Sequence, residues 1–183
     1  MLKYTLLGFL NYEPMTGYEL KSIMDNSTMH FWHAHHSQIY TTLRKLEDQG
    51  LVTSEMDDDD SLQRRTYTLT DAGRADLMEW LGQPMIELPQ IKEDLLLRLF
   101  FSGQRPRQAV LDELRFQRQL HQNKLQVYLS LINNDVIAGF GGAETRMQDD
   151  VRFWQMTLDF GTRYEQMYLS WLDEVIAGLA ADQ

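Results

Sequence analysis

Cysteine is absent from this 183-residue sequence, and its absence excludes several kinds of chemistry. Disulfide frameworks, thiolate zinc sites and cysteine nucleophiles all need that side chain. Hydrophobic residues nevertheless make up 43% of the chain, so a buried core can form without disulfides. A chain without cysteine fits a reducing compartment, and we expect the cytoplasm.

Long apolar runs are also missing. The opening MLKYTLLGFLN is short, meets Asn11, Glu13 and Pro14, and offers no small-residue cleavage site, so it does not fit a signal peptide. No stretch approaches the roughly 18–20 apolar residues that a membrane span needs. We therefore expect a soluble protein without a membrane partner.

Basic residues are scarce, because 17 Lys and Arg stand against 27 Asp and Glu and give a net charge of −10. The acidic excess lies in both halves, with 7 basic and 13 acidic residues in 1–82 and 10 and 14 in 83–183. Proteins that bind nucleic acids are usually basic, and acidic charge is repelled by anionic lipid. A nucleic-acid-binding function would therefore depend on local charge.

Catalytic motifs are missing as well. The sequence has no Gly-rich phosphate loop, no G-x-S-x-G elbow and no H-E-x-x-H helix. Its paired carboxylates, Glu93-Asp94 and Asp149-Asp150, are adjacent rather than facing, and such pairs are usually solvated. We expect no enzymatic activity and no cofactor.

The first part of the chain has the patterns of three helices. Residues 2–10 are almost wholly apolar, which fits either a short buried helix or a strand. Thr16-Gly17-Tyr18-Glu19 matches a capping box and starts a helix that ends near Asn26. Ser37 can cap a third helix, which ends at Gly50.

The third helix has two distinct faces. Ile39, Leu43 and Leu46 follow a helical spacing and predict the buried face. The opposite face is polar and consists of Gln38, Thr41, Thr42 and Lys45, with Arg44 beside them.

A hairpin and a fourth helix follow. The segments LVTSEM and RRTYTLT are rich in β-branched and aromatic residues, and DDDDSLQ separates them. Thr70-Asp71 starts a helix with Leu77, Trp80 and Leu81 on one face. GQPMIELP (82–89) breaks the pattern and predicts a domain boundary.

The pattern beyond this boundary is helical. IKEDLLLRLFFSG predicts one helix ending at Gly103, and PRQAVLDELRFQRQLHQNKLQVYLSLINN predicts a long second one. The turn GFGG (139–142) precedes a third.

Apolar side chains of this last helix recur at alternating three- and four-residue steps, from Met147 onward. Such spacing predicts a packing seam, either against the helix's own domain or against a second copy of the chain. Gly161 weakens the seam and Glu165 interrupts it. The candidate dimer-interface residues are Val151, Trp154, Leu158, Tyr168, Leu172, Val175 and Leu179.

Helix, helix, helix, hairpin, helix is the order of a winged helix, in which the second helix of the helix-turn-helix enters the DNA major groove. The sequence therefore predicts a mainly α fold. It comprises an N-terminal winged helix-turn-helix with a two-stranded β wing and an all-helical C-terminal domain. Residues 37–49 would be the recognition helix, whose Ser, Gln, Thr and Arg side chains suit base edges.

The sequence resembles the PadR family of transcriptional regulators over nearly its whole length. The matching segments are LKYTLLGFL, TGYEL, FWHAHHSQIYTTLRKLEDQGLV and RRTYTLTDAGRADLMEWL, and YLSWLDEVI (168–176) is similar to the phenolic-acid-responsive branch. The resemblance implies a homodimeric repressor that binds a pseudo-palindromic operator in double-stranded DNA and is released by a small aromatic acid. It implies that residues 1–82 bind DNA and that residues 83–183 serve dimerisation and ligand sensing. The alternative is a winged-helix module that binds a protein surface, whose exposed recognition face should be more apolar.

In such a regulator the two recognition helices lie roughly 34–36 Å apart on the duplex. The expected base-edge or groove contacts are Ser37, Gln38, Tyr40, Thr41 and Thr42. The expected phosphate contacts are Arg44, Lys45, Arg64 and Arg65, together with Thr16 and Tyr18 near the start of the second helix. The alternatives are packing inside the domain for Tyr40 and a solvated surface charge for each cation.

The predicted hairpin tip departs from the expected pattern. Asp57 to Asp60 place four carboxylates where a DNA-facing wing should be neutral or basic, and phosphates within about 8 Å would repel them. We expect the tip to point away and to leave Gln63, Arg64 and Arg65 near the DNA backbone; the alternative is a disengaged wing. Asn at positions 57–60 would then tighten DNA binding.

The resemblance further implies a ligand site near the junction of the two domains. Lys21, Lys92 and Arg98 could receive a carboxylate, and the aromatic candidates are Tyr18, Phe31, Trp32, Phe100, Phe101, Phe153 and Trp154. Core packing is the alternative for each aromatic residue. The ligand releases DNA only if it binds the DNA-incompetent arrangement more tightly, and we expect that arrangement to rotate one winged helix relative to its twin.

Four histidines, His30, His33, His35 and His36, precede the recognition helix and could suggest a metal site. Such a site needs imidazoles whose geometry is fixed by further contacts, and the turn before Ser37 gives no assurance of that. We expect these histidines to pack beside Trp32 or to contact phosphate, and we expect no metal.

Overall fold

The computed structural model describes residues 1–28, 32–56, 64–90, 92–133 and 148–181. Its backbone divides into two compact units, Met1–Pro89 (unit 1) and Gln90–Gln183 (unit 2). The segment 83–89, which the sequence places in the second domain, belongs to unit 1. No helix among the described residues is long and apolar enough to cross a membrane.

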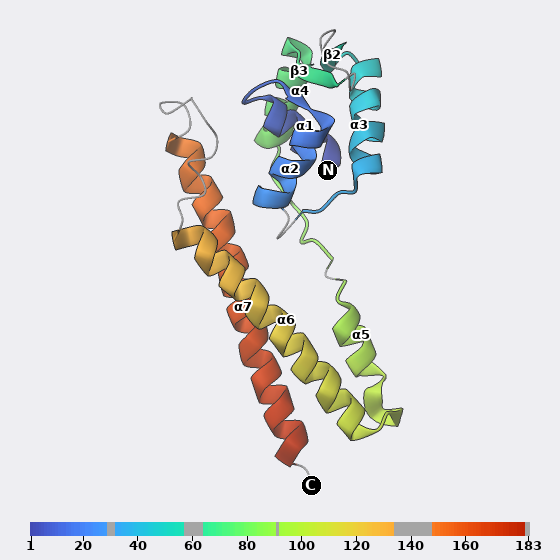
Figure 1. The fold of residues 1–183 in the computed structure, drawn as a ribbon, viewed down its shortest axis with the longest axis vertical. Coiled ribbons are helices and arrows are strands. Elements are labelled where there is room, and N and C mark those ends of the chain that lie inside the picture. Colours follow the sequence, from blue (N-terminus) through green and yellow to red (C-terminus); the bar gives the residue numbers. More distant parts are fainter. Residues whose placement is uncertain (29–31, 57–63, 91, 134–147, 182–183) are drawn as a thin grey trace. The chain divides into compact units, whose positions relative to one another are not determined.

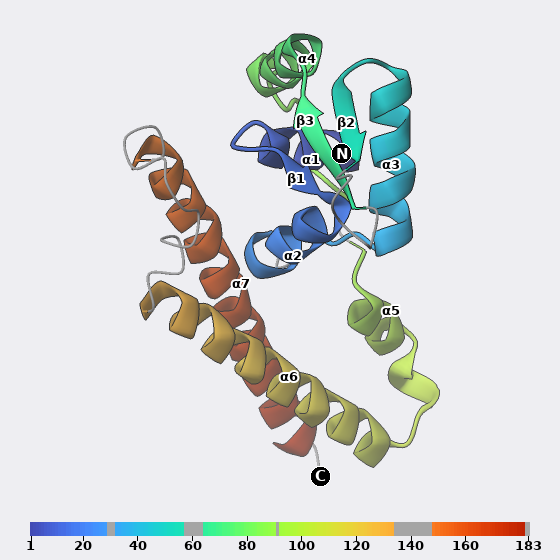
Figure 2. The ribbon, with the colours of Figure 1, turned by 45° about the horizontal axis from the view of Figure 1, so that its top comes forward.

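Unit 1 is a winged helix with a small antiparallel sheet (Figures 1 and 2). Its elements in chain order are α1 (Leu2–Leu10), β1 (Met15–Thr16), α2 (Gly17–Ser27), α3 (His36–Asp48), β2 (Val52–Met56), β3 (Arg65–Leu69) and α4 (Asp71–Gly82). Helix α1 packs against α3 and α4, and α2 packs against α3. The apolar segment 2–10, whose pattern fitted either a short buried helix or a strand, is thus a helix.

The predicted capping box starts α2. The backbone N–H of Glu19 donates to Thr16 Oγ1 at 3.2 Å, and the N–H of Thr16 donates to Glu19 Oε2 at 2.7 Å. Two donors that the first helical turn leaves free are satisfied in this way. Leu20 and Met24 then face the core, while Tyr18 is exposed.

Helix α3 begins one residue earlier than predicted. His35 is the residue before its first turn, and its N–H donates to Gln38 Oε1 at 2.9 Å, so Ser37 lies inside the helix and is not its cap. At the other end Gly50 has a φ of 69°, and the N–H of Leu51 donates to the carbonyl of Leu46 at 2.9 Å. Glycine adopts this left-handed conformation without strain, so the predicted C-terminal signal is confirmed.

The sheet has three strands rather than the predicted two, in the order β1-β3-β2. Strands β2 and β3 form the expected hairpin, with Val52 opposite Leu69 and Met56 opposite Arg65. The two-residue strand β1 pairs with β3 and has no local sequence signal, because only that distant partner makes it a strand.

Helix α4 follows Thr70, whose Oγ1 accepts the N–H of Gly73 at 3.0 Å. Leu77 is buried and Trp80 stacks on Tyr4 with ring centroids 4.5 Å apart, but Leu81 is 60% exposed and does not share the buried face. The core of unit 1 consists mainly of Leu6, Leu7, Leu20, Met24, Ile39, Leu43, Leu46 and Val52.

Unit 2 is all-helical in its described residues. Its elements are α5 (Asp94–Phe100), the short 3-10 helix η1 (Ser102–Gln104), α6 (Arg107–Asn133) and α7 (Gln148–Ala181). The first helix is shorter than predicted, because the chain leaves the α conformation at Phe101. The turn at 139–142 and Met147 lie outside the described residues.

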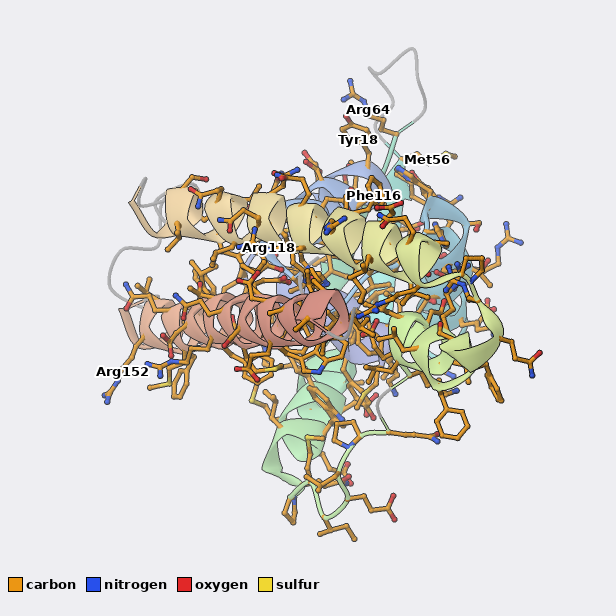
Figure 3. All side chains as sticks on the ribbon, turned by 90° about the horizontal axis from the view of Figure 1, so that it is seen from below. Tyr18, Met56, Arg64, Phe116, Arg118 and Arg152 are labelled. Carbon is orange, nitrogen blue, oxygen red and sulfur yellow. The ribbon has the colours of Figure 1, made fainter. Side chains whose placement is uncertain are left out.

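Helices α6 and α7 lie side by side (Figures 1 and 2). Arg118 points from α6 to α7, where it donates to both carboxylate oxygens of Asp173 at 2.5 and 3.1 Å (Figure 3). One cluster of buried residues in unit 2 consists of Leu95, Val110, Leu114, Tyr168 and Leu172. Side chains from all three α-helices therefore form one core.

Candidate nucleic-acid interface

The outward face of α3 is polar and free of acidic residues over its first ten positions, 36–45. Burial of Ile39, Leu43 and Leu46 turns the polar side chains of this helix away from the core. Ser37, Gln38, Thr41 and Thr42 line a shallow groove together with Leu2 of α1. We call the surface formed by Ser37, Gln38, Thr41, Thr42 and Lys45 the α3 face.

Hydrogen bonds fix how two of these side chains are presented. The Oε1 atom of Gln38 accepts the N–H of His35, so its NH2 group supplies the donors for an outside acceptor. The hydroxyl of Thr42 donates to the carbonyl of Gln38 at 2.7 Å, so its methyl group and oxygen lone pairs remain for other contacts. Amide donors and methyl groups are what base edges in a major groove recognise.

Tyr40 combines the two roles that the sequence left open. Its ring rests on the first residue of α2, since a Cβ atom at Gly17 would lie 2.5 Å from Tyr40 Cε1. The side chain is nevertheless 48% exposed. Tyr40 therefore packs inside unit 1 with part of its ring and offers the rest to solvent; a contact with DNA stays a prediction.

The start of α2 presents one exposed residue and one capping residue. Tyr18 is 69% exposed, and its ring centroid lies 6.5 Å from that of His36. Figure 3 shows Tyr18, Met56 and Arg64 projecting outward from unit 1. Thr16 is partly buried and its hydroxyl oxygen serves the α2 cap, so its expected phosphate contact competes with that structural role.

The candidate cations Arg44, Lys45, Arg64 and Arg65 are all exposed. Arg65 Nη1 lies 3.4 Å from Glu47 Oε2, which makes Arg65 part of an ion pair inside unit 1. The acidic tip Asp57–Asp60 and Gln63 lie outside the described residues, so the direction of the tip stays a prediction.

The histidines before α3 do not form a metal cluster in the part of the chain that the structure describes. The rings of His33 and His35 meet edge to face with centroids 5.0 Å apart. Trp32 is half-buried, and its Nε1 atom has no hydrogen-bond partner among the described residues. His30 lies outside those residues.

The candidate ligand residues are split between the two units, each of which is described by itself, so their convergence stays a prediction. In unit 1 the ammonium group of Lys21 pairs with Asp25, and Phe31 lies outside the described residues. In unit 2 Lys92 is exposed and Arg98 Nη1 lies 2.9 Å from Glu113 Oε1. The exposed aromatic candidates of unit 2 are Phe100, Phe101 and Phe153, while Trp154 is half-buried.

A buried polar cluster in unit 2 was not predicted as a site. Glu165 is only 1% exposed, with His121 Nδ1 at 2.5 Å from its Oε2 and Lys124 Nζ at 3.2 Å from its Oε1. Tyr168 stacks on His121 at 3.9 Å, and burial, followed by the charge of Glu93, raises the pKa of Tyr168. The interruption of the apolar seam at Glu165 was the sequence signal for this cluster.

The predicted dimer seam divides into two parts. Tyr168 and Leu172 are buried in the core of unit 2, and Val175 and Leu179 pack against that core. The burial of Tyr168 and Leu172 supports the intramolecular alternative for those two residues. Val175 and Leu179 are only half-buried, so a contact with a second copy stays a prediction for them. Val151, Trp154 and Leu158 are half-buried, and their role stays a prediction.

Comparisons with known proteins agree with the winged-helix architecture. Residues 6–79 match the model of the Transcriptional regulator PadR-like family, and residues 91–180 match Virulence activator alpha C-term. The chain is 32% identical over 186 residues to the Negative transcriptional regulator PadR of Bacillus subtilis, covering 100% of this chain and 99% of that protein. It is 26% identical to the Probable transcriptional regulator Rv1176c of Mycobacterium tuberculosis, with 97% of each chain covered.

Solved structures give the same result. The structure of Bacillus subtilis PadR in complex with operator DNA matches with a TM-score of 0.80 and 28% identity, over 97% of this chain and 98% of that one. The same protein in complex with p-coumaric acid matches with a TM-score of 0.74 and 28% identity, over 99% and 96%. The Vibrio cholerae virulence activator AphA matches with a TM-score of 0.75 and 25% identity over 100% of both chains. This chain belongs to the PadR-like family of transcriptional regulators.

Proposed function

We propose that this protein is a cytoplasmic repressor that binds a pseudo-palindromic operator as a homodimer and leaves it when a small aromatic acid binds. The observation that carries the proposal is the α3 face, a polar and acid-free surface on the helix that enters the major groove in this fold. The full-length similarity to Bacillus subtilis PadR, a negative regulator that has been seen with operator DNA, supports it.

Base selection falls to the α3 face and phosphate binding to the cations around it. Ser37, Gln38 and Thr41 are exposed along one side of α3 and reach base edges. Arg44, Lys45 and Arg64 neutralise phosphates, which supplies salt-dependent affinity without sequence choice. The net charge of −10 does not oppose this function, because residues 36–45 contain two cations and no acidic side chain.

Dimerisation uses the exposed apolar side chains of unit 2 rather than its core. On α7 Phe153, Met156, Phe160 and Met167 are each more than half exposed and follow the three- and four-residue spacing of a helix-packing seam. On α6 the exposed apolar residues are Phe116, Leu120 and Val127. Apolar side chains left in water along long helices favour association with a second copy.

The proposed effector class comes from Bacillus subtilis PadR, whose structure has been solved in complex with p-coumaric acid. A small aromatic acid needs an apolar slot and a cation or hydrogen-bond donors for its carboxylate. Among the three candidate cations, Lys92 forms no ion pair with another described residue, whereas Lys21 and Arg98 have acidic partners within their units. Release of DNA requires tighter binding of the acid to the DNA-incompetent arrangement.

The test is fluorescence anisotropy with DNA from upstream of this protein's own gene, across a salt series and with or without p-coumarate. We expect selective binding over shuffled DNA, and loss of that binding at saturating acid. Selective binding that ignores the acid would remove the effector from the proposal. Affinity for upstream DNA no better than for shuffled DNA would contradict operator recognition itself.

A further inference from the structure

A carboxylate on the recognition helix binds both strands of the wing. Glu47 lies in the last turns of α3, and its Oε1 accepts the hydroxyl of Ser54 in β2 at 2.5 Å. Its Oε2 lies 3.4 Å from Arg65 Nη1 in β3. One side chain therefore connects the recognition helix with both strands of the hairpin.

The register of the hairpin explains why these groups meet. Ser54 is opposite Tyr67, and Met56 is opposite Arg65, so these four side chains share one face of the sheet. That face is turned to α3, because Tyr67 on it is buried and Glu47 of α3 contacts both Ser54 and Arg65 on it. Figure 2 shows α3 alongside the hairpin.

The residues of α3 on this side form a second stripe. Tyr40, Arg44 and Glu47 recur at helical spacing, i, i+4 and i+7, beside the stripe that carries the α3 face. The chain between α3 and β2 is a turn of three residues, Gln49, Gly50 and Leu51. The turn joins α3 to β2 at one point, and the contacts of Glu47 with Ser54 and Arg65 attach the hairpin stem to α3 at a second point.

We propose that Glu47 is a positioning residue that fixes the angle between the recognition helix and the wing stem through Ser54 and Arg65. The proposal rests on the proposed DNA-binding function, because the angle matters only when helix and wing meet the same duplex. A preorganised pair of contacts avoids the free-energy cost of ordering the wing on binding. Glu47, Ser54 and Arg65 together form a clamp between α3 and the wing stem. Arg64, the residue before Arg65, is the cation that we propose for phosphate binding.

The positioning role of Glu47 and simple charge repulsion predict opposite changes in DNA affinity when Glu47 is removed. Removing an acidic side chain near DNA relieves repulsion from phosphates and should tighten binding. If Glu47 positions the wing, its removal weakens specific binding instead. Glu55 provides a matched control, because it is the residue after Ser54 on β2, is exposed, and carries the same charge.

The experiment compares operator and shuffled DNA for Glu47→Ala, Ser54→Ala, the double variant, Glu47→Gln and Glu55→Ala. We expect Ser54→Ala to bind operator about fivefold more weakly, as loss of one hydrogen bond predicts, and Glu47→Ala to lose at least as much because it also loses the contact with Arg65. The double variant should be no weaker than Glu47→Ala, because the two residues share one interaction. Glu47→Gln keeps an acceptor for Ser54 and should restore most of the affinity, while shuffled DNA should show none of these losses.

The proposal would be overturned if Glu47→Ala bound operator more tightly, as Glu55→Ala should. It would also be overturned if Glu47→Gln failed to restore operator affinity. Amide hydrogen exchange without DNA is the second measurement, and we expect faster exchange in β2 and β3 of Glu47→Ala than of Glu55→Ala. Equal exchange would contradict the clamp. Wild-type protein that does not select its operator is a different result, which contradicts the proposed function.

Discussion

At the scale of single residues, one close contact between α2 and α3 orients an exposed side chain beside the α3 face. The ring of Tyr40 lies against Gly17, where no side chain larger than hydrogen fits without movement. The same ring is half exposed, so a change at Gly17 is transmitted to the protein surface. The residue that orients Tyr40 is therefore in another helix.

Substitution Gly17→Ala should push the Tyr40 ring outward, because the new Cβ would lie 2.5 Å from its Cε1. We expect a loss of about 1 kcal/mol in the free energy of unfolding, as in other overpacked sites, and weaker operator binding. Chemical denaturation and anisotropy would measure the two effects.

Gly8→Ala is the matched control, since a Cβ at Gly8 meets no atom within 4 Å. In the middle of α1 this substitution should raise stability by roughly 0.5–1 kcal/mol through helix propensity alone. Equal behaviour of the two variants would show that the contact between Tyr40 and Gly17 does not matter.

At the scale of elements, the corner between α5 and α6 is held by one carboxylate and two guanidinium groups. Glu113 on α6 lies 2.9 Å from Arg98 Nη1 of α5 and 2.5 Å from Arg105 Nη1 of the connecting segment. The hydrogen bond from Arg105, with a further one from Arg98, holds the pKa of Glu113 below its usual value. Charge thus reinforces the apolar packing of Leu95 against Val110 and Leu114.

A lowered carboxyl pKa in the folded state stabilises the protein above the unfolded-state pKa, and this contribution is lost as the pH falls through the folded-state pKa. Glu113→Gln should therefore lower the free energy of unfolding at pH 7 by on the order of 1 kcal/mol or less, since the partners are partly exposed. The difference from wild type should shrink below about pH 4, where an ordinary glutamate is protonated.

Urea denaturation at several pH values measures this difference, with Glu174→Gln as the control for charge removal at an exposed position of unit 2. A difference between wild type and Glu113→Gln that is constant from pH 7 to pH 3 would contradict the ion-pair account.

Elements with local signals could be predicted from the sequence, and those that depend on distant partners could not. The sequence signals for the capping box of Thr16 and Glu19, the turn at Gly50 and the hairpin strands all lie in neighbouring residues. Strand β1 exists only through β3, and the end of α5 at Phe101 depends on the corner that follows. The helical spacing of α3 predicted its polar outward face. The contact between Arg65 and Glu47 could not be predicted, because it depends on the register of the hairpin.

At the scale of the whole molecule, the same helices must supply a core and an interface. The spacing of apolar residues on α7 could not separate these roles, because Tyr168 and Leu172 on one stripe and Phe160 and Met167 on another both recur at helical steps. Burial separates them: the first stripe packs inside unit 2 and the second is exposed. The exposed stripe is where a second copy should bind.

Phe160→Glu should therefore disrupt the dimer, because a carboxylate replaces a side chain that is 64% exposed in the single chain and would be buried in the pair. Loss of the dimer should weaken operator binding by about 100-fold, since the second recognition helix no longer binds intramolecularly. Analytical ultracentrifugation and anisotropy measure both consequences.

Leu81→Glu, at a position 60% exposed in unit 1, controls for the new charge and should leave the dimer intact. A Phe160→Glu protein that remains dimeric would place the interface elsewhere.

The central claim is that the α3 face reads DNA sequence, and Gln38→Glu tests it most directly. Glutamate keeps the oxygen that accepts the His35 N–H, so the start of α3 is preserved, but it replaces the amide donors with a negative charge. Gln49→Glu adds the same charge at the other end of the helix. By anisotropy against operator and shuffled DNA, we expect Gln38→Glu to lose at least about tenfold in operator affinity and most of its selectivity, while Gln49→Glu retains both. Equal affinities and selectivities for the two variants would contradict the claim.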